Sequence, residues 1–176
     1  MTVLATTWLE VALPLGVPGV FGVVAWWANG ARSERTRLQK LYADAFSAVV
    51  SYQEFPYVIR RRRAPETGQE SLGNEERLRI SEALQQVQEA LNNFRAQITT
   101  ESEAVSAKYE ILVTKTREVA GTDMHDAWEA PPLDNDAGMN ITHLDYAELK
   151  QPEEDYLTAV KTDVSFMRLF VGGRRQ

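Results

Sequence analysis

Cysteine is absent from this chain of 176 residues, and histidine occurs only twice. Without cysteine the chain forms no disulfide and has neither a thiol nucleophile nor a thiolate metal ligand. The sequence also lacks a glycine-rich phosphate loop and a Gly-x-Ser-x-Gly motif, two common signatures of nucleotide binding and of serine hydrolysis. Few residues are therefore suited to catalysis. We expect a protein that is not an enzyme, with no cofactor and no small-molecule substrate.

Charge is distributed unevenly along the sequence. Residues 1–63 carry a net charge of +4 and residues 64–176 a net charge of −10, within a total of −6. The acidic total argues against general nucleic-acid binding, and the asymmetry indicates that the two ends face different surroundings. The length suits one modest domain. Arginine outnumbers lysine fourteen to five, which indicates a GC-rich bacterial genome.

One long uncharged run stands near the N-terminus. It extends over residues 11–28, and a helix of that length spans roughly 27 Å, close to the ~30 Å hydrocarbon core of a bilayer. Trp8 precedes the run, while Trp26 and Trp27 close it, at the levels where aromatic side chains meet lipid headgroups. The run therefore predicts a transmembrane helix within an anchor segment of residues 1–30.

Two other interpretations of this run stay open on the sequence. A cleaved signal peptide would use Ala28 and Gly30 as its small residues, but no basic residue precedes the run, and Glu10 stands where a basic one is expected. A soluble buried helix would carry polar residues on one face, yet none occurs in the run before Asn29. The anchor explains these features better than either alternative.

Basic residues flank the apolar run at one end only. Arg32, Arg35, Arg37 and Lys40 follow it, and no lysine or arginine precedes it. The positive-inside rule then places the N-terminus outside and the remaining domain in the cytoplasm. The four basic side chains would lie at the anionic headgroups of the cell membrane. We therefore predict a single-pass protein whose membrane interface is formed by the three tryptophans and these four residues.

Beyond the anchor, apolar residues recur at alternating steps of three and four, the pattern of coiled coils and helical bundles. In 31–63 the stripe comprises Leu38, Leu41, Ala45, Ala48, Tyr52, Phe55 and Ile59; in 74–121, Ile80, Leu84, Val87, Leu91, Phe94, Ile98, Val105, Tyr109, Leu112 and Val119; in 152–173, Leu157, Val160, Val164, Met167 and Val171. Pro56 is expected to interrupt the first helix. The sequence predicts an all-α fold: an N-terminal transmembrane helix followed by an antiparallel bundle of about four amphipathic helices.

Turn-forming and capping residues set the expected helix boundaries. Residues 64–73 contain proline, glycine and serine and predict a loop, after which Asn74 caps the next helix. The apolar stripe of residues 74–121 is broken at Glu101. This segment therefore forms either one helix with a stutter or two helices, the second capped by Thr100.

The segment 122–151 is expected to be irregular and acidic, up to Pro152, which opens the last helix in its first turn. It contains His125 and Glu129, which would share one face of a helix because they lie four residues apart. With neighbouring aspartates they could hold a divalent metal, but their spacing matches no established metal motif. We predict instead an acidic surface with Trp128 packed inward, and no metal site.

Four consecutive arginines, Arg60, Arg61, Arg62 and Arg63, form the densest charge in the chain. They could complete the C-terminal end of a helix and face acidic helices, or they could contact lipid or a protein partner. The acidic domain around them disfavours a third role in nucleic-acid binding. The sequence favours the helix-end role and leaves lipid or partner contact open.

Three functions of different classes remain. The first is a membrane-anchored protein whose cytoplasmic bundle contacts or scaffolds a protein partner, or associates with itself, because thin amphipathic helices leave apolar surface uncovered. The second is an oligomeric effector that permeabilises the bilayer. The third is a metal-dependent enzyme that uses His125 and Glu129. We favour the first, with the lipid bilayer and another protein as partners.

Overall fold

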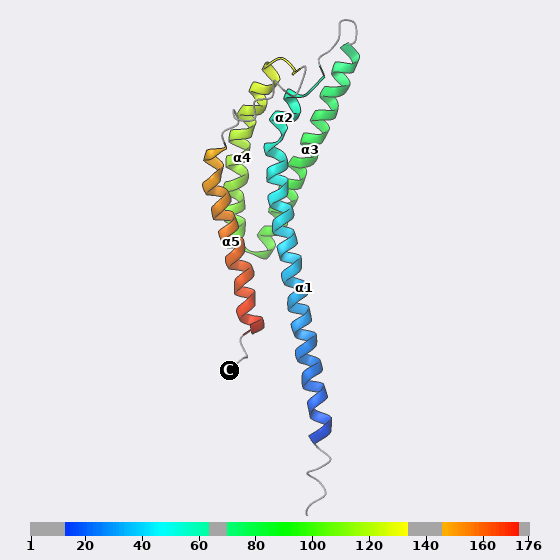
Figure 1. The fold of residues 1–176 in the computed structure, drawn as a ribbon, viewed down its shortest axis with the longest axis vertical. Helices are drawn as coiled ribbons and strands as arrows, with labels where there is room; N and C mark the ends of the chain where they lie inside the picture. The colour runs from blue at the N-terminus through cyan, green and yellow to red at the C-terminus, as the bar shows by residue number, and fades with distance from the viewer. Residues whose placement is uncertain (1–12, 64–69, 134–145, 173–176) are drawn as a thin grey trace, which may run out of the picture. The chain divides into compact units, whose positions relative to one another are not determined.

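The computed structural model describes residues 13–63, 70–133 and 146–172, where every regular element is an α-helix (Figure 1). Side chains are described for residues 30, 33–63, 72–133 and 146–165. The chain divides into two compact units, Met1–Leu38 with Val164–Gln176 and Gln39–Asp163. The larger unit is a helical bundle, called the bundle below. The all-α class predicted from the sequence is therefore confirmed.

The first helix, α1, covers Leu13–Gln53. The predicted membrane span begins at Val11, outside the described residues, and the side chains of its helical part, 13–28, are also outside them. Within the described part of the chain, no helix combines the length and the apolar character that crossing a bilayer requires. The transmembrane helix therefore stays a prediction from the sequence.

The stripe predicted in residues 31–63 is the part of the core that the sequence identifies best. Its seven residues are all buried, with side chains no more than 9% exposed. Gln53 ends α1 ahead of Pro56, which has no backbone N–H to continue the ladder. A short helix, α2 (Phe55–Arg60), restarts with this proline in its first turn. The interruption expected at Pro56 is therefore observed.

The break between α1 and α2 leaves the carbonyl of Gln53 without its usual helical donor. The N–H of Tyr57 donates instead to the carbonyl of Glu54, at 3.1 Å. The Gln53 carbonyl accepts a hydrogen bond from the hydroxyl of Tyr146, at 2.6 Å. The start of α5 thus supplies the partner that the proline break removes.

Two tyrosine hydroxyls of the bundle allow this bond to be tested by matched changes. Tyr146→Phe should lower the free energy of unfolding by about 1–2 kcal/mol, because it leaves a backbone carbonyl unsatisfied. Tyr109→Phe should leave stability unchanged or raise it, because the buried Tyr109 hydroxyl has no hydrogen-bond partner among the described residues. Urea unfolding followed by circular dichroism measures both changes in stability. Equal losses of stability in the two variants would contradict the hydrogen bond from Tyr146 to the Gln53 carbonyl.

Two long helices follow, α3 covering Glu70–Glu101 and α4 covering Glu103–Glu129. They form an antiparallel hairpin: Arg95 pairs with Glu110, and Arg117 donates a hydrogen bond to the side-chain carbonyl of Asn92, at 3.1 Å. Ile80, Leu91 and Ile98 of α3, and Val105, Tyr109 and Leu112 of α4, are buried. Six of the ten residues of the stripe predicted in 74–121 therefore lie in the core, and the other four, Leu84, Val87, Phe94 and Val119, are partly exposed.

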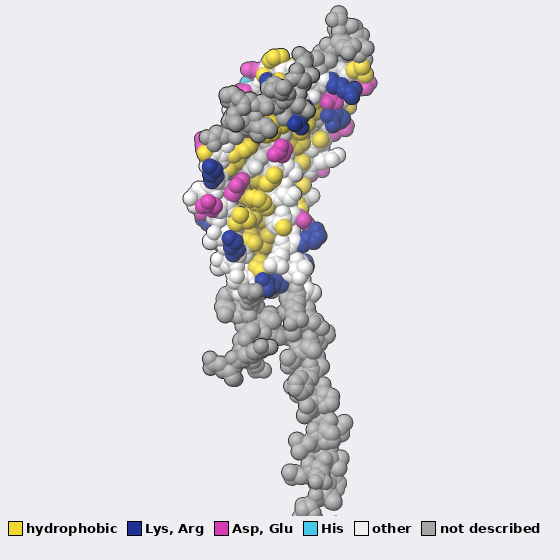
Figure 2. Space-filling model, in the orientation of Figure 1, with side chains coloured by type: hydrophobic (Ala, Val, Ile, Leu, Met, Phe, Trp, Pro, Cys, Tyr) yellow, Lys and Arg dark blue, Asp and Glu magenta, His cyan; other side chains and the backbone are white. Residues whose placement is uncertain are grey.

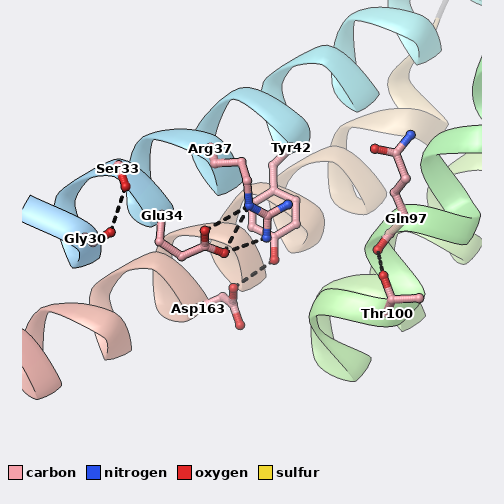
Figure 3. Close-up of polar contacts among 8 residues, drawn as sticks. All are labelled: Gly30, Ser33, Glu34, Arg37, Tyr42, Gln97, Thr100 and Asp163. Atoms are coloured by element: carbon pink, nitrogen blue, oxygen red, sulfur yellow. Dashed lines mark hydrogen bonds and ion pairs between the residues drawn. The ribbon is translucent and has the colours of Figure 1, made fainter. Parts of the chain in front are cut away.

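Residues 74–121 form parts of two helices, which meet at Ser102. The backbone of Ser102 is extended (φ −153°, ψ 116°), and its hydroxyl accepts a long hydrogen bond, 3.5 Å, from the N–H of Val105. The predicted cap, Thr100, does not fill this role. Its hydroxyl donates to the carbonyl of Gln97 at 2.7 Å, within α3 (Figure 3).

The outer boundaries of this hairpin also differ from the expected ones. Helix α3 begins at Glu70, so Asn74 lies inside the helix and not at its cap. Helix α4 continues through Gly121 to Glu129, and the first part of the segment expected to be irregular is therefore helical. Met124 and Ala127 extend the buried face of α4. Their burial explains why packing carries the helix past the glycine, which favours a helix end only weakly.

The last helix, α5, covers Ala147–Gly172, and Pro152 lies inside it. The proline was expected in the first turn, but the helix starts earlier and buries Leu149. Tyr156 is fully buried, whereas the neighbouring Leu157, predicted as a core residue, is 39% exposed. The predicted stripe is therefore wrong at Leu157. Val164, which it also contains, is buried.

Tyr156 sets the register of α5 because its ring and its hydroxyl both find partners. The ring stacks on Phe46, with centroids 6.1 Å apart, and lies tilted against Tyr109 at 5.6 Å. The hydroxyl donates to the backbone carbonyl of Tyr42, at 2.9 Å. A leucine at this position would fill volume but make none of these directional contacts.

Polar contacts show the direction of α5 in the bundle. The hydroxyl of Tyr42 donates to Asp163 at 2.8 Å (Figure 3), and Gln53 donates to Glu153 at 3.1 Å, so α1 and α5 run antiparallel. Two ion pairs with nitrogen–oxygen distances of 2.8 Å, Lys108–Asp155 and Lys115–Glu148, give the same relation for α4 and α5. Helices α1 and α5, α3 and α4, and α4 and α5 are thus antiparallel pairs.

Candidate functional site

The most developed polar site of the bundle lies where α2 and α4 end. The guanidinium of Arg62 donates hydrogen bonds to three backbone carbonyls at the end of α4: those of Ala127 (2.8 Å), Trp128 (3.1 Å) and Ala130 (2.7 Å). It also donates to the carbonyl of Ile59, at 2.9 Å. Carbonyls at a helix C-terminus lack intrahelical donors, and a cation there also opposes the negative end of the helix dipole.

Trp128 lies beside two arginines from different segments of the chain. The guanidinium carbon of Arg62 is 5.0 Å from the centre of the Trp128 ring, and that of Arg77, from α3, is 5.6 Å from it. Both distances suit cation–π attraction. Trp128 is only partly exposed, as the prediction of inward packing requires. The sequence contains no local signal for the role of Arg77, since it lies fourteen residues beyond the arginine run.

The arginines around Trp128 act on one another electrostatically. Burial lowers the pKa of Arg62, and the positive charges of Arg77 and Arg60 lower it further. The backbone carbonyl of Arg60 accepts a hydrogen bond from the N–H of Leu133, at 3.0 Å, which ties the chain after α4 to the end of α2. Arg61 and Arg63 are exposed. One arginine of the run therefore caps a helix, and the others leave their charge near the surface.

The predicted membrane-interface residues are described only in part. Trp8 lies outside the described residues, and the side chains of Trp26, Trp27 and Arg32 also lie outside them. Arg35 is half-buried, and its Nε has no hydrogen-bond partner among the described residues. The described side chains therefore neither support nor exclude the membrane interface predicted from the sequence.

Arg37 and Lys40 both pair with carboxylates of their own helix. Arg37 donates to both carboxylate oxygens of Glu34, with a shortest distance of 2.6 Å (Figure 3), and these bonds lower the pKa of Glu34. Lys40 pairs with Asp44 at 2.6 Å. These exposed pairs reduce the net positive charge that the two residues present to an anionic surface.

His125 and Glu129 do share a face of α4. Their side chains are 71% and 72% exposed, and His125 Nε2 lies 3.4 Å from a carboxylate oxygen of Glu129. Among the described residues, no group of three or more histidine, aspartate or glutamate side chains is placed to hold a metal. Two side chains alone fall short of the three or four protein ligands typical of zinc sites.

Buried tyrosines are the other titratable groups with strongly altered surroundings. Burial raises the pKa of Tyr42, Tyr109, Tyr146 and Tyr156 well above the usual range. Such hydroxyls stay protonated at neutral pH and serve as hydrogen-bond donors. Three of them donate to Asp163, to the Gln53 carbonyl and to the Tyr42 carbonyl, contacts that stabilise the bundle.

The fold and this site define a class: an all-α protein whose bundle carries a cationic, tryptophan-containing helix end. No protein-family model, curated protein or solved structure matches the chain. Its function therefore has to be argued from its own residues.

Proposed function

We propose that the chain is a single-pass, membrane-anchored helical protein of a bacterial cell membrane, without enzymatic activity. Its N-terminus lies outside and its bundle in the cytoplasm. The bundle works through protein–protein contact, holding a partner or further copies of itself at the membrane. The uncharged run over residues 11–28 and the tryptophans that bracket it support the anchor.

One observation carries the proposal: the same helix contains most of the apolar run and five of the seven residues of the first stripe of the core. Helix α1 covers Leu13–Gln53 without a described break. Its N-terminal part is uncharged up to Ala28, and its C-terminal part buries residues of the bundle such as Tyr42 and Val49. A helix that is apolar at one end and amphipathic at the other suits a chain that attaches a domain to a bilayer.

Exposed apolar side chains support a role in protein contact. Among the described side chains, five large ones are more than a third exposed: Val50, Leu72, Leu78, Ile111 and Leu157. They come from α1, α3, α4 and α5, and Figure 2 shows apolar surface on one face of the bundle. Apolar surface of this kind is a common feature of interaction sites.

A reporter fused after Gln176 tests the proposed orientation in living cells. Green fluorescent protein at this position should fluoresce, and alkaline phosphatase should stay inactive, because the C-terminal side is predicted to be cytoplasmic. Moving positive charge to the other side of the run, by adding lysines before Trp8 and replacing Arg32 and Arg35 by glutamine, should reduce this preference. An active phosphatase on the unaltered chain would contradict the orientation.

A further inference from the structure

We propose that the cationic end of the bundle is a binding site for a phosphoryl group. Its residues, called the arginine cluster, are Arg62 and Arg77 beside Trp128, together with Arg60 near Arg62 and Arg63 near Glu76. The site goes beyond the proposed function and does not rest on the membrane anchor.

Contacts with one tryptophan place Arg62 and Arg77 together although they come from different segments. Arg62 and Arg77 both lie over the ring of Trp128, at 5.0 Å and 5.6 Å from its centre. Arg60 is close enough to Arg62 to act on its charge, and Arg63 is close enough to Glu76 to do the same. In Figure 2, Lys and Arg side chains lie over the N-terminal turns of α3, the helix that supplies Arg77, with Asp and Glu side chains among them.

The cluster carries more positive charge than its described neighbours neutralise. The side chains of Arg60, Arg63 and Arg77 form no hydrogen bond or ion pair with other residues in the ranges that the structure describes. Glu76 is already engaged, because Arg79 donates two hydrogen bonds of 2.8 Å to its carboxylate. These bonds, with the nearby charge of Arg63, lower the pKa of Glu76. The charges acting on Arg62 are those of other arginines.

Arg62 is held in a fixed position within the cluster. Its guanidinium is held by the carbonyls at the end of α4, so it cannot turn away from its like-charged neighbours. Repulsion between guanidinium groups is relieved when an anion binds among them. The structure thus brings together one immobile arginine, which organises the site, and three whose side chains form no hydrogen bond or ion pair with the described residues.

Phosphoryl chemistry fits these donors best. A guanidinium presents parallel N–H groups that match two oxygens of a phosphate, and several arginines can share one tetrahedral anion. A single carboxylate offers only two oxygens and one charge, which would leave most of the cluster unneutralised. The phosphoryl group comes from an anionic lipid headgroup or from a free phosphate compound; both present the same oxygens.

Calorimetric titration of the purified full chain with inorganic pyrophosphate, in a neutral detergent at low salt, tests the site. The Arg63→Gln/Arg77→Gln double variant should bind at least roughly tenfold more weakly, since it removes two charge-assisted contacts. The Lys150→Gln/Lys161→Gln variant carries the same change of net charge on exposed positions of α5 and should stay within about twofold of the unaltered chain. Arg62 is left in place because it holds the end of α4.

Mixed micelles distinguish the two sources of the phosphoryl group. If phosphatidylglycerol lowers the affinity for pyrophosphate several-fold and phosphatidylcholine does not, the headgroup occupies the site; if neither does, the ligand is a free phosphate compound. Absence of pyrophosphate binding, or equal weakening in both double variants, would overturn the proposal. Binding of polyglutamate without binding of pyrophosphate would also overturn it, in favour of an acidic protein partner.

Discussion

Replacing Arg62 by alanine is expected to lower the free energy of unfolding by about 2–4 kcal/mol, since a hydrogen bond to a charged group contributes roughly 1.5–3 kcal/mol. The variant loses the donor of four backbone carbonyls, three of them at the end of α4, and a cation near the negative end of the helix dipole. Urea unfolding of the full chain, followed by far-ultraviolet circular dichroism, measures the change.

Its neighbour in the same run supplies the control. Arg63 is exposed, and no side-chain hydrogen bond ties it to the described residues, so Arg63→Ala should change stability by less than about 0.5 kcal/mol. Arg62→Lys should recover only part of the loss, because one ammonium group cannot reach carbonyls that a planar guanidinium bridges. Equal effects of the two alanine substitutions would show that the run acts only through its total charge.

Replacing Tyr156 by alanine should cost about 3–5 kcal/mol, the range for removing a large buried aromatic side chain. Tyr156 is fully buried, and the change removes its stacking on Phe46, its contact with Tyr109 and its hydrogen bond to the carbonyl of Tyr42. The unfolding midpoint in urea should fall strongly while the slope of the transition stays constant.

The adjacent Leu157 tests the register of α5. Its side chain is 39% exposed, so Leu157→Ala should cost no more than about 1 kcal/mol. The apolar spacing in the sequence assigns Leu157 to the core, whereas the structure assigns Tyr156. A larger loss for Leu157→Ala than for Tyr156→Ala would restore the register predicted from the sequence.

The sequence predicted the buried face and the C-terminal end of α1 well, because both depend on residues close together in the sequence. Five apolar residues of α1 follow one another at steps of three and four and define one buried face, and Pro56 stops the helix by removing a backbone donor. Prediction was poorer for α5 because its pattern is ambiguous. Tyr156 and Leu157 are adjacent apolar residues, and the choice between them depends on Phe46 and Tyr109, which are distant in the sequence.

Helix ends were predicted less well, because several residues compete for each cap. Thr100, Ser102 and Asn74 all have capping side chains, but Thr100 donates to its own helix and Asn74 lies within α3. Ser102 becomes the cap because its backbone is extended where the chain reverses. Whether Thr100 or Ser102 caps α4 is decided by the packing of α3 on α4.

The cationic site was also predicted only in part, because it too depends on the tertiary fold. A helix-end role for the arginine run was favoured from its charge, and Arg62 fills that role. The helix that it caps most extensively is α4, whose end lies 65 to 68 positions further along the chain. Arg77 and Trp128 join the cluster only through the tertiary fold. No periodicity in the sequence connects these residues.

Alkaline carbonate extraction of cell membranes tests most directly the central claim, that the chain is anchored through its apolar run. The full chain should stay in the membrane pellet, and so should a Val23→Leu/Val24→Leu variant. A Val23→Asp/Val24→Asp variant should move to the supernatant, because each charge near the centre of a span costs roughly 2.5–3.5 kcal/mol. Release of the unaltered chain into the supernatant, together with the aspartate variant, would contradict the account.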